Sequence, residues 1–235
     1  MSPATLLVRC KAPLQSWGTR SRFDVRDTGT EPSKSGIVGL LAAALGRPRD
    51  ADMSDLAGLF MAVRVDRPGT VVSDFQTVGG GDWNGQPYHV SLPSGKAGST
   101  ALATAYFIAD ASFLVALEGD RPFLETLHSA LQNPVWPLCL GRRAFPPADP
   151  MWLRCGVQDG DAMAVLRSVE WPGSGADQER VAPSLRAVVD CRPGEDGDFR
   201  QDVPLSFVST RRLYGRRRVR SVWLTPLEGV CSSPA

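Results

Sequence analysis

The residues of this chain best able to do chemistry are arginines, which make up 23 of its 26 basic residues. A guanidinium binds phosphate through two parallel hydrogen bonds and stacks on nucleobases, so its placement can indicate a nucleic-acid site. A GC-rich genome also produces arginine, alanine, glycine and proline from its codons alone, and only clustering is therefore informative. Three clusters occur: an early cluster, a basic pair and a late basic run. They consist of Arg9, Arg20, Arg22, Arg26 and Lys34, of Arg142 with Arg143, and of Arg211 to Arg220. We call the predicted loop 12–33, which holds most of the early cluster, the early basic loop.

The early basic loop combines charge with aromatic rings. It begins with an amide, a hydroxyl and an indole, and three arginines follow around Phe23: Gln15, Ser16, Trp17, Arg20, Arg22 and Arg26. Single-stranded nucleic acid binds where basic residues alternate with aromatic ones, because the charges meet phosphates and the rings meet bases. We therefore predict an RNA-binding loop, although a tryptophan such as Trp17 is by itself more often a core residue.

A helix is predicted to begin beside this loop, at Ser33 or Ser35, either of which can cap it. Free N–H groups and the positive end of the helix dipole favour an anion there, and Lys34 adds a charge. The Lys34-Ser35 pair resembles the end of a Walker A loop, but Thr28 and Ser33 stand where that loop needs glycine, so no ATP site is expected. We predict that Ser33, Lys34 and Ser35 contact a backbone phosphate; the alternative is a capped helix with a solvated lysine.

The sequence has no set of residues with the spacing of a known catalytic site. It lacks metal-ligand, nucleophile-elbow and dinucleotide-binding motifs, and its two histidines are His89, beside Tyr88, and His128, inside a predicted helix. A catalytic site would also need a positioned acid and a group that stabilises the transition state. We therefore predict a protein that is not an enzyme and needs no cofactor or metal. RNA cleavage by His89 or Tyr88 is the alternative.

Composition is that of a folded soluble protein. The chain has 235 residues, is 43% hydrophobic and 22% charged, and carries a formal net charge of +1. Its longest apolar run, 36–46, is too short for a membrane span, which needs about 20 residues. Five scattered cysteines without a C-x-x-C pair predict free thiols, and together with the lack of a secretory signal they favour the cytoplasm.

The order of predicted elements favours an α+β protein with a ferredoxin-like domain over residues 1–150. Strands are expected at 5–11, 59–66, 70–76, 104–109, 112–118 and 135–140, and helices from about 33 to 45 and over 121–132. Without insertions this is the split β-α-β arrangement, which puts the first and third core strands side by side in an antiparallel sheet. The insertion at about 77–103 is glycine-rich, has no apolar periodicity and is too long for an ordinary turn, so we expect it to be functional.

Residues 151–235 are predicted to form a smaller, β-rich C-terminal region, with the boundary in the proline-rich run 146–150. Short strands are expected within 152–158, 184–191, 205–209 and 220–227, and a helix at 159–168. The late basic run is expected to form two strands or a hairpin around Gly215. It would be either a solvated face or a contact to phosphate or to a partner.

Three stretches of the sequence closely resemble the CasD family of CRISPR-associated proteins: LLVRCKAPLQSWG, SRFDVRDTGTEPSKSGIVGLLAAALG and PVWPLCLGRRAFPP. ASFLVAL fits too; the resemblance covers residues 5 to about 150 and is looser beyond. The family belongs to the RAMP superfamily, whose members use ferredoxin-like, RRM-related domains. Its members hold the 5′ handle of the guide RNA in the type I-E Cascade complex.

The resemblance implies particular contacts. Residues 15–35 and the loop Gly141, Arg142 and Arg143 correspond to segments that contact the RNA handle in the family. The insertion corresponds to a protruding thumb, which lies against the neighbouring backbone subunit and the RNA. Type I-E complexes leave guide-RNA cleavage to a separate endonuclease, and the chain has no Lys-His pair, so we expect a non-catalytic subunit of a CRISPR surveillance complex for antiviral defence.

The implied partners are the CRISPR RNA 5′ handle and the backbone and large subunits of Cascade. Target DNA would be reached indirectly, through base pairing of the guide in the complex. No membrane partner is expected. The alternatives are an endoribonuclease of the same superfamily that processes repeat RNA, and a ferredoxin-like domain that binds a small anionic metabolite.

Overall fold

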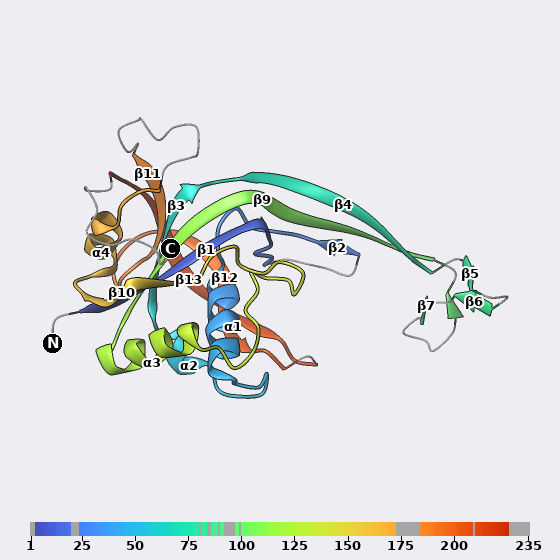
Figure 1. Ribbon diagram of the computed structural model, residues 1–235, viewed down its shortest axis with the longest axis horizontal. Helices are drawn as coiled ribbons and strands as arrows, with labels where there is room; N and C mark the ends of the chain where they lie inside the picture. Colours follow the sequence, from blue (N-terminus) through green and yellow to red (C-terminus); the bar gives the residue numbers. More distant parts are fainter. Residues whose placement is uncertain are drawn as a thin grey trace.

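The computed structural model describes residues 3–19, 24–79, 81–83, 86–88, 90–91, 97–98, 100–172, 184–208 and 210–225. Within these residues the chain folds around one sheet of nine strands, whose main path is β10-β1-β9-β3-β11-β13-β12 (Figure 1). The strands of this path are β1 (Ala4–Gln15), β3 (Phe60–Arg67), β9 (Thr100–Gly119), β10 (Trp152–Asp159), β11 (Leu185–Asp190), β12 (Asp198–Ser206) and β13 (Leu213–Leu224). The predicted α+β class is confirmed, with a large antiparallel sheet.

Helices cover both faces of the sheet. One face carries α1 (Lys34–Leu45), α2 (Ser54–Ala57) and α3 (Arg121–Gln132), which pack on Leu6, Val63 and Phe113. The other carries α4 (Ala162–Ser168), which packs on Leu7, Ala62 and Leu114. Because successive strand residues point to opposite faces, the central strands contribute to both cores.

The structure confirms that the first and third core strands are neighbours, since β1 pairs with β9 over its whole length. It also confirms both predicted helices of the first 150 residues. The side chain of Ser33 accepts a hydrogen bond from the Gly36 N–H and caps α1, and Gly46 ends α1 with a φ of 71°. The strands predicted at 104–109 and 112–118 are one continuous strand, β9, in which Asp110 has a φ of 58°.

The strand predicted at 135–140 is wrong, because this segment is irregular and β10 takes the fourth position, beside β1. The N–H groups of Val135 and Trp136 donate to the carbonyls of Ala44 and Ala43, at the end of α1. Pro134 and Pro137 have no N–H to offer a neighbouring strand. The loop at Gly141 therefore follows an irregular segment that is held by α1, and not the last strand of the core.

Strands of the C-terminal region continue the same sheet. β10 pairs with β1 and β11 pairs with β3, so the sheet has no break near residue 150. The division of the chain there stays a prediction. The predicted hairpin around Gly215 is wrong, because Gly215 lies inside β13, opposite Val203. The described residues between β12 and β13 are 207–208 and 210–212. Cys10, Cys139 and Cys191 are free thiols as expected, whereas Cys155 is disulfide-bonded, which the scattered spacing did not indicate.

A long two-stranded ribbon extends from the body of the molecule (Figure 1). It consists of β4 (Thr70–Gly79) and the first half of β9, paired from Thr70 and Ala109 out to Gly79 and Thr100. Its far end carries β5 (Gly81–Trp83), β6 (Gln86–Tyr88), β7 (Val90–Ser91) and β8 (Ala97–Gly98). Near the body, β2 (Val25–Arg26) joins β9 in parallel.

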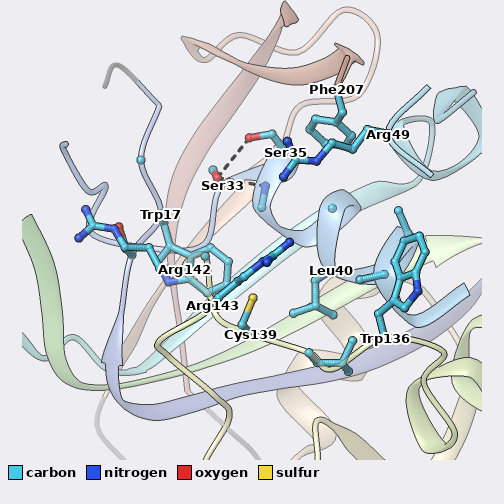
Figure 2. Close-up of a pocket in the computed structure, with 18 of the residues that line it drawn as sticks. Trp17, Ser33, Ser35, Leu40, Arg49, Trp136, Cys139, Arg142, Arg143 and Phe207 are labelled. Atoms are coloured by element: carbon cyan, nitrogen blue, oxygen red, sulfur yellow. Dashed lines mark hydrogen bonds between the residues drawn. The ribbon is translucent and has the colours of Figure 1, made fainter. Parts of the chain in front are cut away.

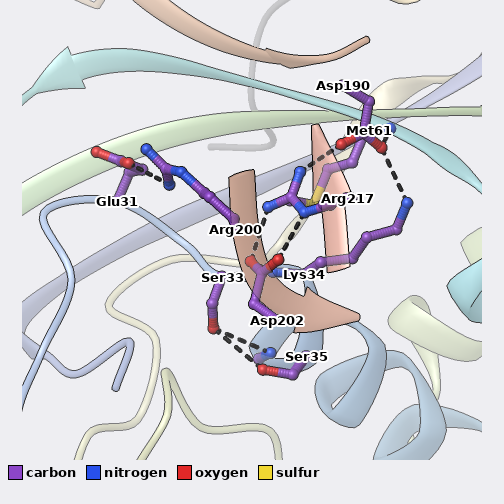
Figure 3. Close-up of polar contacts among 10 residues, drawn as sticks. Glu31, Ser33, Lys34, Ser35, Met61, Asp190, Arg200, Asp202 and Arg217 are labelled. Carbon is purple, nitrogen blue, oxygen red and sulfur yellow. Dashed lines mark hydrogen bonds and ion pairs between the residues drawn. The ribbon is translucent and has the colours of Figure 1, made fainter. Parts of the chain in front are cut away.

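A buried cluster of four charged residues joins the start of α1 to the C-terminal strands (Figure 3). Lys34 Nζ lies 2.9 Å from Asp190 Oδ2, and the Lys34 N–H donates to Asp202 Oδ2 at 2.8 Å. Arg217 donates to Asp202 at 2.7 Å and also to Asp190. All four side chains are less than a tenth exposed. We call this set, Lys34, Asp190, Asp202 and Arg217, the charge cluster.

The two carboxylates and two cations of the charge cluster compensate one another. Burial alone would raise the pKa of Asp202, but hydrogen bonds and charge from Arg217 and the Lys34 N–H outweigh it, and the pKa lies below its ordinary value. The loop before α1 is held in a similar way, because Arg186 and Arg200 both pair with the buried Glu31. Residues from beyond 180 therefore fix the position of α1.

We predict that Arg217→Met lowers the free energy of unfolding by about 3–5 kcal/mol, because it leaves buried Asp202 and Asp190 without their shared cation. Urea denaturation measures this, with Arg167→Met on the exposed side of α4 as the control, which should change stability by less than about 0.5 kcal/mol. Equal unfolding free energies for the two variants would contradict the assignment.

The same variant should respond differently to acid. A depressed folded pKa stabilises the fold above the unfolded value of about 3.9, and this stabilisation is lost as the pH falls through the folded value. Wild-type protein should therefore lose more stability below about pH 4 than Arg217→Met does. If the free energies of unfolding of the two proteins fall in parallel over that pH range, Arg217 does not stabilise the ionised form of Asp202.

Candidate nucleic-acid interface

A groove of about 1070 Å³ runs along α1 and is lined by segments far apart in the sequence (Figure 2). Its walls come from the loop after β1, from one side of α1, from the irregular segment 136–146 and from the turn between β12 and β13. The groove thus brings together the two predicted RNA-binding segments, with Ser16 and Arg26 from the first and Gly141, Arg142 and Arg143 from the second.

The groove is strongly basic. Of the described residues that line it, six are arginines and only Asp27 is acidic; the arginines are Arg26, Arg47, Arg49, Arg142, Arg143 and Arg212. Arg47 is neutralised by a two-pronged ion pair with Asp55. Arg26, Arg49, Arg143 and Arg212 are exposed and make no ion pair with any residue that the structure describes. Such a concentration of unpaired positive charge favours a polyanion.

Arg142 holds the second loop against the sheet. Its guanidinium lies 5.9 Å from the ring centres of both Phe107 and Phe145, and it donates to the carbonyls of Arg26 and Tyr106 at 3.3 and 3.1 Å. Burial and the nearby charge of Arg26 lower its pKa. Arg142 therefore has a structural task in addition to any ligand contact, whereas the neighbouring Arg143 is exposed.

Gly141 allows the two loops to touch. The Ser16 N–H donates to the Leu140 carbonyl at 3.1 Å. Gly141 has a φ of 93°, and a Cβ there would lie 1.7 Å from the Ser16 carbonyl oxygen. Only glycine fits this conformation at this distance. The groove wall formed by Ser16 and Gly141 is therefore set by backbone contact.

Two predicted contact residues lie in the core instead. Gln15 is fully buried; its amide donates to the carbonyls of Cys10 and Ala111, and its Oε1 accepts from the Trp17 indole N–H. Trp17 is 1% exposed and packs on Gly36, where a Cβ would lie 2.7 Å from the ring. These two side chains support the groove from below, and the predicted stacking role of Trp17 does not agree with its burial.

The predicted phosphate site at the start of α1 is occupied from within the chain. The Lys34 ammonium and N–H already bind Asp190 and Asp202 in the charge cluster. Ser33 uses its hydroxyl as the helix cap, and Ser35 lies beside it, 3.4 Å between the two Oγ atoms, on the groove wall. Arg20 and Arg22 lie outside the described residues.

The two histidines do not meet the groove within the described part of the chain. His128 lies on α3, packs edge-on against Trp152 and contacts Gln132 at 3.2 Å; burial lowers its pKa. His89 lies outside the described residues, so its candidate catalytic role is untested.

Sequence reasoning missed part of the groove wall: Arg47, Arg49, Trp136, Phe207 and Tyr214. Arg212, which also lines the groove, belongs to the late basic run, for which a phosphate contact was one of the alternatives. One signal existed, because Gly36, Gly39 and Ala43 form a stripe of small residues on α1, which is typical of a helix face with a close neighbour. Gly36 of this stripe contacts Trp17, while Gly39 faces the groove, with Phe207 Cζ as the nearest atom to a Cβ there, at 3.8 Å.

We predict that Gly141→Ala displaces the loop and destabilises the protein, because a methyl group cannot fit beside the Ser16 carbonyl. The matched control is Gly194→Ala, whose glycine has a similar φ of 88° but no atom within 4 Å of a Cβ. Both variants place an alanine in the left-handed backbone conformation, which costs about 1–2 kcal/mol. The difference between their melting temperatures therefore isolates the effect of the contact with Ser16. Equal melting temperatures would contradict the contact.

Comparison with known proteins gives a consistent set of matches. The family described as "CRISPR-associated protein (Cas_Cas5)" matches residues 5–220. The chain is 32% identical over 172 residues to the CRISPR system Cascade subunit CasD of Escherichia coli (strain K12), covering 66% of this chain and 72% of that protein.

Two solved structures are similar over nearly the whole chain. A chain of a structure described as "CRISPR RNA-guided surveillance complex" superposes with a TM-score of 0.78 at 33% identity, covering 94% of this chain and 90% of that one. A chain described as "Crystal structure of Cas protein" gives a TM-score of 0.73 at 40% identity, covering 98% of this chain and 100% of that one.

Proposed function

Because this chain belongs to the Cas5 family of CRISPR-associated proteins, we propose that it is a non-catalytic, RNA-binding subunit of a Cascade-type surveillance complex. The resemblance to the CasD family seen in the sequence is thereby confirmed. In this proposal the groove along α1 holds the 5′ handle of the CRISPR RNA. The observation that carries it is the meeting of two distant basic loops in one groove, whose described lining has one acidic residue and four arginines without an ion-pair partner among the described residues.

The proposed contacts follow the polar groups that line the groove. Arg26 and Arg143 are exposed and bind phosphates, and the half-buried Arg142 contributes while it anchors the loop at Gly141. Ser35 is half-buried and Ser16 is buried; both offer hydroxyl groups from the groove lining. Gln15, Trp17, Ser33 and Lys34 act indirectly, because internal bonds already occupy their polar atoms. Arg20 and Arg22 remain proposed RNA contacts because of their positions in the early basic loop.

We interpret the part of the sheet ordered β10-β1-β9-β3, with α1 and α3 on one face, as a ferredoxin-like unit. The ribbon of β4 and β9 is the proposed thumb. Its register places Val71, Phe75, Leu102 and Tyr106 on one face, and each is between 37% and 65% exposed. We propose that this apolar face seats the neighbouring backbone subunit, as large exposed apolar patches commonly mark protein contacts.

The proposed role is to hold RNA for a complex in the cytoplasm. No helix in the described part of the chain is long and apolar enough to cross a membrane. The described lining of the groove offers cations and hydroxyl groups, which bind phosphates, and no histidine. Target DNA would be read by the guide RNA that the complex carries.

Incubation of the purified protein with handle and repeat RNA in EDTA should show retention without cleavage. Each phosphate contact to single-stranded RNA contributes about 0.7 to the slope of log affinity against log salt. The double variant Arg26→Gln/Arg143→Gln should therefore flatten that slope by roughly 1.4 with an unchanged melting temperature, since both side chains are exposed.

The matched control is Arg154→Gln/Arg167→Gln, two exposed arginines that do not line the groove. It should leave the slope unchanged. Equal slopes in the two double variants would move the RNA site away from the groove. Cleaved repeat RNA would replace the proposal with the endoribonuclease alternative.

The thumb makes a separate prediction. Phe75→Ser/Leu102→Ser should keep the melting temperature and RNA affinity but weaken co-purification with the backbone subunit, because it removes apolar area from an already exposed face. The control is Asp74→Ser/Gln76→Ser on the opposite face of the ribbon. Full assembly by the Phe75/Leu102 variant, or equal loss by both variants, would show that the apolar face does not seat the neighbour.

A further inference from the structure

The end of the groove away from Arg142 in Figure 2 has its own aromatic and basic side chains, Trp136, Phe207 and Arg49. They come from segments that the proposed handle contacts do not use. Tyr214 and Arg212 also line the groove. Figure 2 shows Trp136 beside Leu40 of α1 and on the other side of the view from Arg142, with Arg49 next to Phe207. Arg49 and Arg212 are exposed and unpaired among the residues that the structure describes.

Trp136 has the properties of a rigid stacking platform. Its side chain is 44% exposed, so it is not a core residue. Its N–H donates to the Ala43 carbonyl at 3.2 Å and the N–H of Val135 donates to Ala44 at 3.0 Å, while prolines stand on both sides at 134 and 137. The backbone is therefore fixed before a ligand binds, and stacking on the ring loses little conformational entropy of this segment.

The space in front of Trp136 suits a strand of RNA better than a small metabolite. The whole groove measures about 1070 Å³, at the upper limit of ordinary small-molecule pockets, which run from about 300 to 1,000 Å³. Arginines line it on both sides of the view in Figure 2, with Arg142 and Arg143 on one side and Arg49 on the other. A π face in the same groove as guanidinium groups that have no ion-pair partner among the described residues is an arrangement that can bind a base together with its phosphate.

We propose that this end of the groove binds one nucleotide of single-stranded RNA, with its base stacked on Trp136 and its phosphate on Arg49, assisted by Arg212. The inference rests on the proposed function and extends it, because it assigns a base-binding subsite to residues outside the two predicted loops. Every nucleobase has a π face, so stacking here contributes affinity without choosing a particular base.

The first test uses the full chain and labelled handle RNA in a salt titration. Trp136→Leu keeps apolar bulk but removes the π face; it should weaken binding about ten-fold, within the range of base–aromatic stacking, and leave the salt slope unchanged. Trp136→Phe should restore most of the affinity. Arg49→Gln should flatten the slope by roughly 0.7, because it removes a phosphate contact. Trp223→Leu is the matched control, since Trp223 is 68% exposed on β13 and does not line the groove.

The second test locates the stacked nucleotide. Each base of the handle RNA is replaced in turn by an abasic unit. One replacement should weaken binding to the wild-type protein about as much as Trp136→Leu does, and should cost the Trp136→Leu protein nothing further, as a double-mutant cycle requires for two groups in contact. Melting temperatures of all variants exclude loss of fold as the cause.

The outcomes separate this inference from the proposed function. If the Arg26/Arg143 variant loses affinity while Trp136→Leu and every abasic RNA bind normally, the subsite is wrong and the function stands. If Trp136→Leu weakens assembly with partner subunits but not RNA binding, the ring is a protein contact and the subsite is again wrong. If the wild-type protein does not retain handle RNA, both proposals fail.

Discussion

The charge cluster is the constraint on which the rest of this structure depends. Removing four ionised groups from water is costly, and it is compatible with folding only because Lys34 and Arg217 meet Asp190 and Asp202 at hydrogen-bonding distance. This requirement fixes the start of α1 against strands that come more than 150 residues later. Since one side of α1 forms a wall of the groove, a site built mainly from the first and middle parts of the chain depends on the last part for its shape.

The cluster also decides where an RNA phosphate can bind. A helix N-terminus favours one anion, and in this protein the Asp202 carboxylate takes that place at 2.8 Å from the Lys34 N–H. Positive charge for a ligand must then come from the side of the helix. Many of the described arginines form ion pairs within the chain, as in the pairs of Arg47 with Asp55 and Arg186 with Glu31. In this way a chain with a net charge of only +1 can place in one groove four arginines that have no ion-pair partner among the described residues.

The sequence predicted those features of the fold that neighbouring residues and the order of elements determine. The cap at Ser33, the helix from about 33 to 45 and the adjacency of β1 and β9 all followed from local sequence pattern or element order. Long-range packing decided the rest. Nothing near Lys34 in the sequence indicates partners at 190 and 202, and the burial of Trp17 depends on Gly36. The apolar residues at 135–140 indicated a strand. Two prolines and hydrogen bonds to the end of α1 instead keep this segment irregular, on the wall of the groove. The sequence therefore did not predict that Trp136 is exposed.

Strand β9 physically connects the two surfaces to which we assign function. Its first half forms one side of the ribbon, where Leu102 and Tyr106 face solvent, and its second half lies at the centre of the sheet. Between them, Phe107 and the Tyr106 carbonyl contact Arg142, which also binds the carbonyl of Arg26. A neighbour that fixes the ribbon thus acts on the strand that anchors the second basic loop, so that seating a subunit and ordering the RNA groove share one mechanical element.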